Sequence, residues 1–193
     1  MEFLKNVVFI KSIFEYKELP TEDLPQVVFV GKSNVGKSSF INTITNNKKM
    51  AKVGNTPGKT KCINQFIVDG KLTMCDLPGY GYSTMSRSEK ENINKLVDRF
   101  MNNNDKIKQV FFLVDIRHKP SKEDRHMYEW ILGQELPFTI IANKADKIAK
   151  TKIPAYIDVI RKELFAKEEI IPFSTQTKLG LDIVIKKILE QYN

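Results

Sequence analysis

The strongest constraint on the fold of this chain is an apolar run followed at once by a glycine-rich segment and a potential helix. Residues 26–30 read QVVFV, residues 31–38 read GKSNVGKS, and residues 39–44 can open a helix. The middle segment fits the pattern G-x-x-x-x-G-K-[ST], which requires a strand before it and a helix after it. Because both are present, the sequence predicts a strand, a phosphate-binding loop and a helix in succession.

Each residue type in this loop has a physical task. Glycines adopt backbone angles that a Cβ would forbid, so successive N–H groups can face phosphate oxygens. Lys37 would reach the β and γ phosphates, Ser38 would offer its hydroxyl to Mg²⁺, and the following helix would add its positive end. The residues predicted to contact phosphate are Gly31, Lys32, Ser33, Asn34, Val35, Gly36, Lys37, Ser38 and Ser39.

The remaining chain alternates strand-like and helical patterns, which is typical of an α/β fold with a mostly parallel sheet and helices on both faces. Strands are predicted over residues 6–13, 26–30, 62–68, 71–76, 107–116, 138–142 and 170–173. Helices are predicted over residues 37–46, 154–165 and 181–192, with two more starting at capping boxes, Ser88 with Glu91 and Ser121 with Asp124. Asp69-Gly70 favours one antiparallel hairpin pair, and the length of 193 residues favours a single domain over 1–193.

Composition narrows the class of protein. No apolar run approaches the roughly 18 residues of a membrane span, and the first residues lack a signal-peptide pattern, so we expect a cytoplasmic protein. Cys62 and Cys75 have no metal-ligand spacing, which argues against a zinc site. The formal charge of +8 favours a polyanionic partner such as nucleic acid, although scattered lysines would serve solubility equally well.

The segment Asn143-Lys144-Ala145-Asp146 follows a predicted strand, where nucleotide-binding domains recognise the base. The Asp146 carboxylate can accept hydrogen bonds from the ring N–H and the exocyclic amine of guanine. Adenine has no such amine, and its ring nitrogen is an acceptor that the carboxylate would repel. Since an unpaired buried charge is costly, Asp146 predicts guanine as the base.

The segment Asp76-Leu77-Pro78-Gly79 ends another apolar run. A carboxylate at such a place is costly unless it serves a partner. We expect Asp76 to hold Mg²⁺ through water and the Gly79 N–H to face the γ-phosphate; the alternative is an Asp that only caps a turn. Together the three motifs predict a protein that binds GTP or GDP with Mg²⁺.

The order of the motifs is more specific than any one of them. GKSNVGKS, TPGKT, DLPGYGY and NKAD, with Ser174-Thr175 after the last strand, resemble the EngB (YihA) family of the TrmE-Era-EngA-EngB-septin-like GTPases. Residues 114–121, VDIRHKPS, are also similar to that family. TPGKT and GYGY mark this branch, and the resemblance extends from about Phe3 to the last helix.

The resemblance implies a three-layer Ras-like P-loop GTPase fold, Mg²⁺-dependent GTP binding and slow hydrolysis. It implies association with the large ribosomal subunit during assembly, and a role in cell division and septation; we expect a monomer. It also makes residues 47–61 the first switch and Thr60 the second Mg²⁺ ligand beside Ser38, where spacing alone leaves Thr56 open. By similarity, the nucleotide site further includes Gly58, Lys59, Thr60, Lys61, Cys62, Asp76, Leu77, Pro78, Gly79, Asn143, Lys144, Ala145, Asp146, Phe173, Ser174 and Thr175, the last three beneath the guanine.

One position departs from the commonest GTPase chemistry. Tyr80 follows Gly79, where a water-orienting glutamine is frequent, and no residue is assigned as catalytic. We therefore expect weak hydrolysis that a partner or K⁺ completes. In related GTPases an Asn at the position of Asn34 helps to hold K⁺, but it could equally tie the backbone of its own loop. His118 is expected to be a surface residue rather than a base.

Two other functions use the same loop. A metabolic phosphotransferase would leave NKAD unexplained and would need an acceptor-binding domain, for which the sequence gives no sign. A septation-directed scaffold, with structural nucleotide and no ribosomal role, shares every motif. Ribosome binding would separate that scaffold from the predicted switch.

Overall fold

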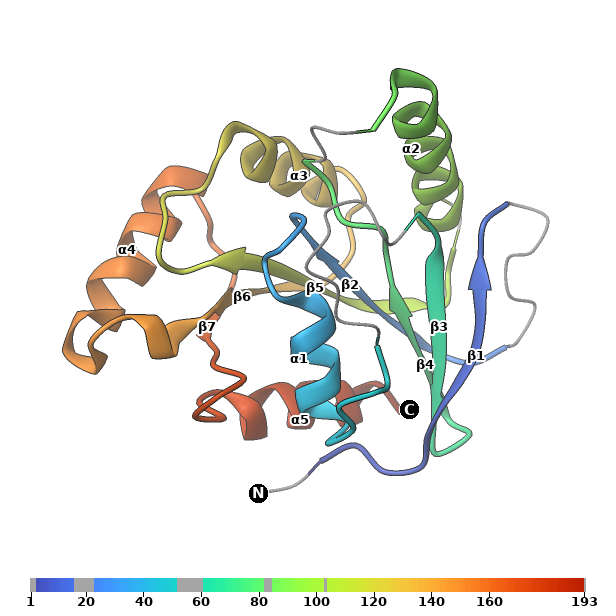
Figure 1. Cartoon of the computed structure of the whole chain (residues 1–193), viewed down its shortest axis with the longest axis horizontal. Coiled ribbons are helices and arrows are strands. Elements are labelled where there is room, and N and C mark those ends of the chain that lie inside the picture. The colour runs from blue at the N-terminus through green and yellow to red at the C-terminus, as the bar shows by residue number, and fades with distance from the viewer. Residues whose placement is uncertain (1–2, 16–22, 52–60, 82–84, 103, 193) are drawn as a thin grey trace.

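The structure is a computed structural model that describes residues 3–15, 23–51, 61–81, 85–102 and 104–192. Within them strands and helices alternate along the chain (Figure 1). The strands are β1 (Val7–Ile13), β2 (Gln26–Gly31), β3 (Ile63–Val68), β4 (Leu72–Asp76), β5 (Ile107–Asp115), β6 (Phe138–Asn143) and β7 (Ile170–Pro172). The helices are α1 (Lys37–Ile44), α2 (Arg87–Met101), α3 (Lys122–Leu132), α4 (Ile153–Leu164) and α5 (Leu181–Leu189), with 3₁₀ turns η2 (Ala145–Lys147), η3 (Lys150–Lys152) and η4 (Glu190–Tyr192).

The described strands form one sheet in the order β1-β3-β4-β2-β5-β6-β7. The five strands from β4 to β7 in this order pair in parallel, which confirms the predicted mostly parallel sheet. β3 runs antiparallel to β4, and the turn between them has positive φ at both Asp69 (51°) and Gly70 (67°). That backbone matches the twist of a tight hairpin, so the predicted hairpin is confirmed.

β1 adds a second antiparallel pair, because it lies beside β3 at the edge of the sheet. The sequence predicts the strand but not this pairing, since the register joins residues that are fifty or more positions apart. Val8, Phe9 and Ile10 of β1 are exposed. Their apolar character therefore reflects a sheet edge and not the core.

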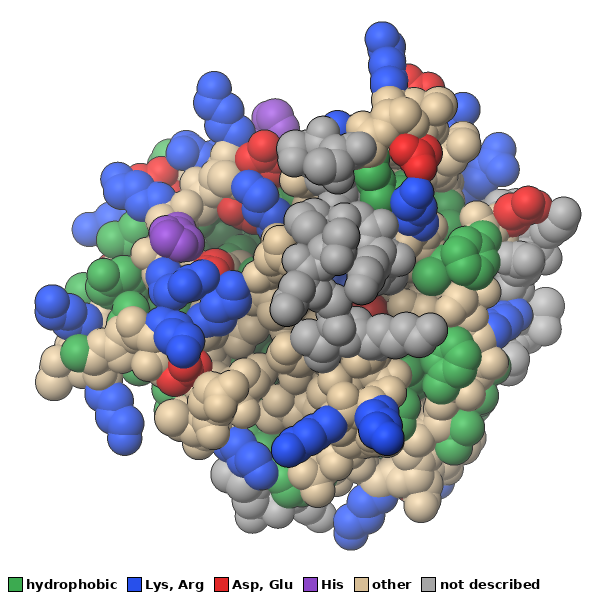
Figure 2. Space-filling view, in the orientation of Figure 1, with side chains coloured by type: hydrophobic (Ala, Val, Ile, Leu, Met, Phe, Trp, Pro, Cys, Tyr) green, Lys and Arg blue, Asp and Glu red, His purple; other side chains and the backbone are tan. Residues whose placement is uncertain are grey.

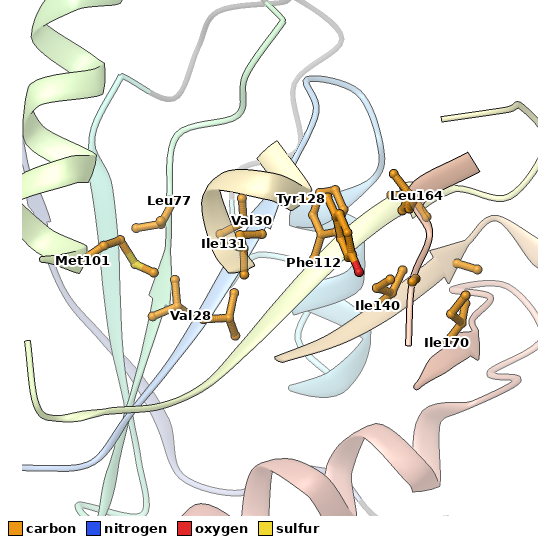
Figure 3. Close-up of a cluster of buried hydrophobic side chains, with 14 of the residues drawn as sticks. Val28, Val30, Leu77, Met101, Phe112, Tyr128, Ile131, Ile140, Leu164 and Ile170 are labelled. Atoms are coloured by element: carbon orange, nitrogen blue, oxygen red, sulfur yellow. The ribbon is translucent and has the colours of Figure 1, made fainter. Parts of the chain in front are cut away.

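Helices cover both faces of the sheet, as predicted (Figure 1). Alternate residues of the central strands point to opposite faces. In β5, Phe112 points into a cluster with Tyr128 and Ile131 of α3 (Figure 3), whereas Phe111 joins Phe40 of α1 on the other face. The sheet thus separates two buried clusters, one under α2, α3 and α4 and the other under α1 and α5.

The helix starts test the capping predictions. Ser121 and Asp124 form the predicted capping box of α3. The predicted box of α2 is wrong by two residues: Ser86 and Glu89 form it, and α2 begins at Arg87. Both pairs satisfy the same spacing, and an ion pair of Lys61 with Glu89 at 2.6 Å accompanies the observed one.

Three helices end before the predicted residues: α4 by one residue, at Leu164, and α1 and α5 by two and three residues. α1 ends at Ile44, where the Thr45 hydroxyl donates back to the Ile41 carbonyl at 2.8 Å and Asn46 turns to a φ of 48°. α5 ends at Leu189 and continues as the 3₁₀ turn η4. Among the described residues, every helix is too short or too polar to span a bilayer.

Candidate functional site

The predicted motifs meet at one edge of the sheet. The phosphate loop leaves β2 at Gly31, the Asp76 segment leaves β4, and the NKAD segment leaves β6. β2 pairs in parallel with β4 and with β5, and β5 pairs in parallel with β6. Ligands of open α/β sheets bind at the carboxyl ends of such strands. The fold therefore brings the three motifs to the expected place.

Close packing shapes the phosphate loop. Gly36 has a φ of 99°, and a Cβ there would lie 2.6 Å from Nδ2 of Asn143. A Cβ at Gly31 would lie 2.8 Å from Cγ1 of Val35. Both glycines are thus required by conformation or by space. Because α1 begins after Gly36 without a side-chain cap, its first N–H groups are available to an anion.

Lys37 links this loop to the Asp76 segment. Its ammonium forms a buried ion pair with Asp76 and donates to the Leu77 carbonyl oxygen at 2.6 Å. The buried Asp76 therefore has a cationic partner within the chain, next to the proposed phosphate position, and its predicted contact with Mg²⁺ stays a prediction. Pro78 and Gly79 continue this buried segment toward Tyr80.

The base side is held by hydrogen bonds between loops. Nδ2 of Asn143 donates to the Val35 carbonyl at 3.0 Å, and the Ala145 N–H donates to the Phe173 carbonyl at 2.9 Å. The Ser174 hydroxyl donates to Oδ1 of Asp146 at 2.8 Å. The Oδ1 atom of Asn143 is buried with no hydrogen-bond partner among the described residues.

The charge of Asp146 suits its predicted task. Burial raises the pKa of this carboxyl, but the hydrogen bond from Ser174 and the neighbouring Lys147 ammonium outweigh burial and hold the pKa below its usual range. Asp146 is therefore an ionised acceptor at neutral pH. Ser174 also accepts from the N–H groups of Gln176 and Thr177 at 3.1 and 3.0 Å, which fixes the turn that contains Thr175.

Sequence reasoning assigned no role to Asp115, at the end of β5. Asp115 accepts from Arg117 at 2.9 and 2.7 Å and from the Lys144 ammonium at 2.9 Å. The same ammonium donates to the Asn34 carbonyl at 2.7 Å. Burial raises the Asp115 pKa, but these donors outweigh it and lower the pKa to about 2. An aspartate two residues before an arginine, directly after an apolar strand, is the sequence pattern that could have indicated this contact.

The Tyr80 side chain contacts α3. Its hydroxyl donates to Oδ1 of Asp124 at 2.6 Å, at the start of α3. Burial, with the nearby Asp124 charge, raises the Tyr80 pKa, so the phenol stays neutral. Its backbone carbonyl accepts from the Ser33 N–H at 2.9 Å, and the Lys32 ammonium donates to Ser121 at 3.1 Å. Tyr80 thus ties the Asp76 segment to α3.

Some predicted site residues make contacts elsewhere, and others lie outside the described residues. Lys61 pairs with Glu89 of α2 at 2.6 Å and the Cys62 thiol donates to Asn64 at 3.5 Å, and their predicted contact with the nucleotide stays a prediction. Gly58, Lys59 and Thr60, together with Thr56, lie outside the described residues. His118 is exposed, as expected. The Asn34 side chain is exposed and, within the described ranges, forms no hydrogen bond.

The fold and these loops define a P-loop GTP-binding protein with a Ras-like domain. A family model described as "50S ribosome-binding GTPase" matches residues 26–144. "Probable GTP-binding protein EngB" of Clostridioides difficile (strain 630) is 40% identical over 184 residues, 94% of this chain and 91% of that protein. The protein of the same description from Thermoanaerobacter pseudethanolicus is 39% identical and covers 98% of both chains. This chain belongs to the EngB family of GTP-binding proteins.

Solved structures agree on the fold. The crystal structure of a probable GTP-binding protein EngB superposes with a TM-score of 0.72 at 23% identity, covering 86% of this chain and 98% of that one. Era of Aquifex aeolicus superposes with a TM-score of 0.71 at 23% identity, covering 88% of this chain and 57% of that one. The Ras-like GTPase fold is therefore confirmed.

Proposed function

We propose that this protein hydrolyses GTP slowly with Mg²⁺ and that its nucleotide state controls association with the large ribosomal subunit during assembly. On this proposal residues 1–193 form one GTP-binding domain that acts as a cytoplasmic monomer and is needed for normal cell division and septation. The description of the matching family as ribosome-binding supports the choice of partner.

The contact of Lys37 with the Asp76 segment carries the proposal of a switch. Its ammonium holds both the Asp76 carboxylate and the Leu77 carbonyl. A triphosphate and its cation would draw on the same ammonium and the same carboxylate, so binding must rearrange this contact. The change would continue along the backbone to Tyr80 and, through its hydroxyl, to α3.

The residues present fit Mg²⁺. Asp76 and Ser38 supply carboxylate and hydroxyl oxygens, the hard donors that Mg²⁺ takes beside phosphates, and Asp76 is buried next to the phosphate-binding lysine. Bound there, the ion would neutralise charge on the phosphates. Thr60 stays the predicted second ligand.

On the base side, we assign guanine recognition to the ionised Asp146. Lys144 and Asn143 join the base loop to the phosphate loop, and the segment from Phe173 to Thr175 forms the floor of the base site. The hydrogen bond from Ser174 to Asp146 supports this arrangement, because it fixes the carboxylate before guanine arrives.

The test of the switch is co-sedimentation of the full chain with purified large ribosomal subunits. We expect binding with a non-hydrolysable GTP analogue, weaker binding with GDP, and no such difference in Asp146→Ala. Equal binding in every nucleotide state would refute the switch. Absence of ribosome binding in a protein that still binds GTP would instead favour the septation-directed scaffold.

Asn34 supports a potassium-assisted reaction. Its side chain is exposed beside the phosphate loop and has no hydrogen-bond partner in the described part of the chain. A monovalent cation held there would add positive charge near the phosphates to that of Lys37. We expect faster GTP turnover in K⁺ than in Na⁺, and equal turnover in the two salts for Asn34→Ala. Equal rates in both salts for the wild type would exclude this role.

A further inference from the structure

Phe165, just after α4, combines two unusual properties. Its ring is 85% exposed, more than any other large apolar side chain in the described residues. Its backbone is left-handed, with φ 54° and ψ 34°. The Phe165 N–H donates to the Lys162 carbonyl at 3.3 Å, and the Ala166 N–H donates to the Arg161 carbonyl at 3.0 Å. This pair of hydrogen bonds closes helices at a position that glycine usually occupies.

The fold gains little from a phenylalanine at this position. A left-handed backbone is strained for a residue with a bulky side chain, whereas glycine adopts it freely. A ring so exposed recovers almost none of the free energy that burial would provide. Strain combined with exposure of an aromatic side chain points to a contact outside the chain.

The surroundings of Phe165 are basic. Residues 147–167, here named the α4 segment, hold six Lys or Arg and two Asp or Glu, a net charge of +4 within a chain of +8. One of the two acids, Glu163, is paired with Lys119 at 3.2 Å and Arg125 at 3.1 Å. Lysine and arginine side chains project around the end of the molecule that α4 forms (Figure 2).

The lysines of the α4 segment are available for a partner. Lys150, Lys152, Lys162 and Lys167 are exposed and form no ion pair with any described residue. The acids that follow are engaged elsewhere: Glu168 accepts from the Tyr128 hydroxyl at 2.8 Å, and Glu169 pairs with Lys187 at 2.8 Å. The Lys162 carbonyl accepts from the Phe165 N–H, so the two residues lie next to each other where α4 ends.

An exposed ring flanked by unpaired lysines has the chemistry of a site for single-stranded nucleic acid. Aromatic rings stack on unpaired bases of any sequence, while ammonium groups contact the phosphates. An acidic peptide would use the lysines but would not need the ring. The combination therefore favours RNA.

We propose that the α4 segment is an RNA-binding surface on which an unpaired base stacks against Phe165 while Lys162 and Lys167 contact the adjacent phosphates. This inference rests on the proposed ribosomal role, because unpaired ribosomal RNA is the ligand that such a role would present. It concerns a surface at the end of α4 and is independent of the nucleotide state.

The test measures fluorescence anisotropy of a short single-stranded RNA of mixed sequence with the full chain. Phe165→Gly should weaken RNA binding about ten-fold, the contribution of one stacked base, and yet raise the melting temperature by about 2 °C through relief of strain. Phe165→Trp should retain the affinity. A structural role for the ring would move stability and binding in the same direction.

The matched control is Phe14→Gly. Phe14 is 61% exposed, follows β1 at the opposite edge of the sheet and has no left-handed backbone. Its substitution should leave RNA binding unchanged. The salt dependence of RNA binding distinguishes the ring from the lysines. Replacing Lys162 and Lys167 by Gln should lower the slope of log affinity against log salt by about 0.7 for each phosphate that a lysine no longer neutralises. Phe165→Gly should leave this slope unchanged.

Unchanged RNA binding by Phe165→Gly would overturn the proposal. If Phe165→Gly binds RNA normally but binds intact large subunits poorly, the surface would instead contact a ribosomal protein. If the chain binds RNA through Phe165 but shows no nucleotide-dependent binding to subunits, the proposed switch fails and the RNA surface stands.

Discussion

The two ends of the nucleotide site are held in different ways. On the base side the hydrogen bonds already join one loop to another: Ser174 holds Asp146, and Lys144 bridges Asp115 and the Asn34 carbonyl. On the phosphate side Lys37 is occupied by Asp76. The base side can accept a ligand without exchanging these partners, whereas the phosphate side must exchange them.

This difference separates recognition from signalling. On the proposed function, a preorganised base side would place the acceptor for guanine without a cost of rearrangement at binding. On the proposed function, a bound triphosphate would change the contacts of the phosphate side, so this side would report whether a γ-phosphate is present. Three substitutions and one pH titration test this difference and are given in falling order of expected effect.

The largest effect is expected for Asp146→Ala. Removal of a carboxylate that accepts two hydrogen bonds from guanine should weaken GTP binding about a thousand-fold. Inosine triphosphate lacks the exocyclic amine, so the wild type should prefer GTP over it by about ten-fold, and the variant should bind both equally. Competition against a fluorescent GTP analogue measures both quantities. A variant that still prefers GTP would show that another group reads the base.

Asp115→Asn should have the next largest effect. The amide keeps the shape but removes the negative charge that faces Lys144, so we expect the dissociation rate of bound GDP to rise about ten-fold. Glu163→Gln is the matched control, since Glu163 also holds two cations but does not contact the phosphate loop. Its dissociation rate should equal that of the wild type.

A double-mutant cycle shows whether Asp115 acts through Lys144. In a Lys144→Met background, the further change Asp115→Asn should not alter the dissociation rate, because the ammonium it held is gone. Additive effects of the two changes would mean that Asp115 stabilises the domain in general.

Tyr80→Phe tests the phosphate side. Without the 2.6 Å hydrogen bond to Asp124, the free energy of unfolding should fall by about 1.5 kcal/mol and the melting temperature by about 5 °C. GDP affinity, measured by calorimetric titration, should stay close to that of the wild type. A drop in GDP affinity of about ten-fold, as large as the change in dissociation rate expected for Asp115→Asn, would mean that the two sides do not differ in this way.

The smallest effect concerns pH. The donors around Asp115 hold its pKa at about 2, below the usual 3.8. A carboxyl with a lowered pKa in the folded state contributes stability that is complete above its usual pKa and disappears as pH falls toward the folded value. The stability difference between wild type and Asp115→Asn in urea should therefore be constant near neutral pH and shrink below about pH 4. A difference that persists unchanged at pH near 2 would mean that the charge is not responsible.

Local motifs were predictable, and contacts between distant segments were not. The phosphate loop and NKAD depend on residues within a few positions of one another, so their spacing predicts their structure. The capping box of α2 failed because Ser86 with Glu89 and Ser88 with Glu91 fit the same pattern. The contact of Asp115 with Lys144 required the pairing of β5 with β6, which local periodicity does not encode.

The sharing of one buried cluster by α1 and α5 has a consequence for how the protein matures. α1 carries the phosphate loop, and its residues Phe40 and Ile41 pack in the same cluster as Val184 and Ile188 of α5. During synthesis α1 cannot complete this packing until α5 has left the ribosome. We therefore expect competence to bind nucleotide to arise late in translation, and a chain broken before α5 to lose GTP binding even with every motif intact.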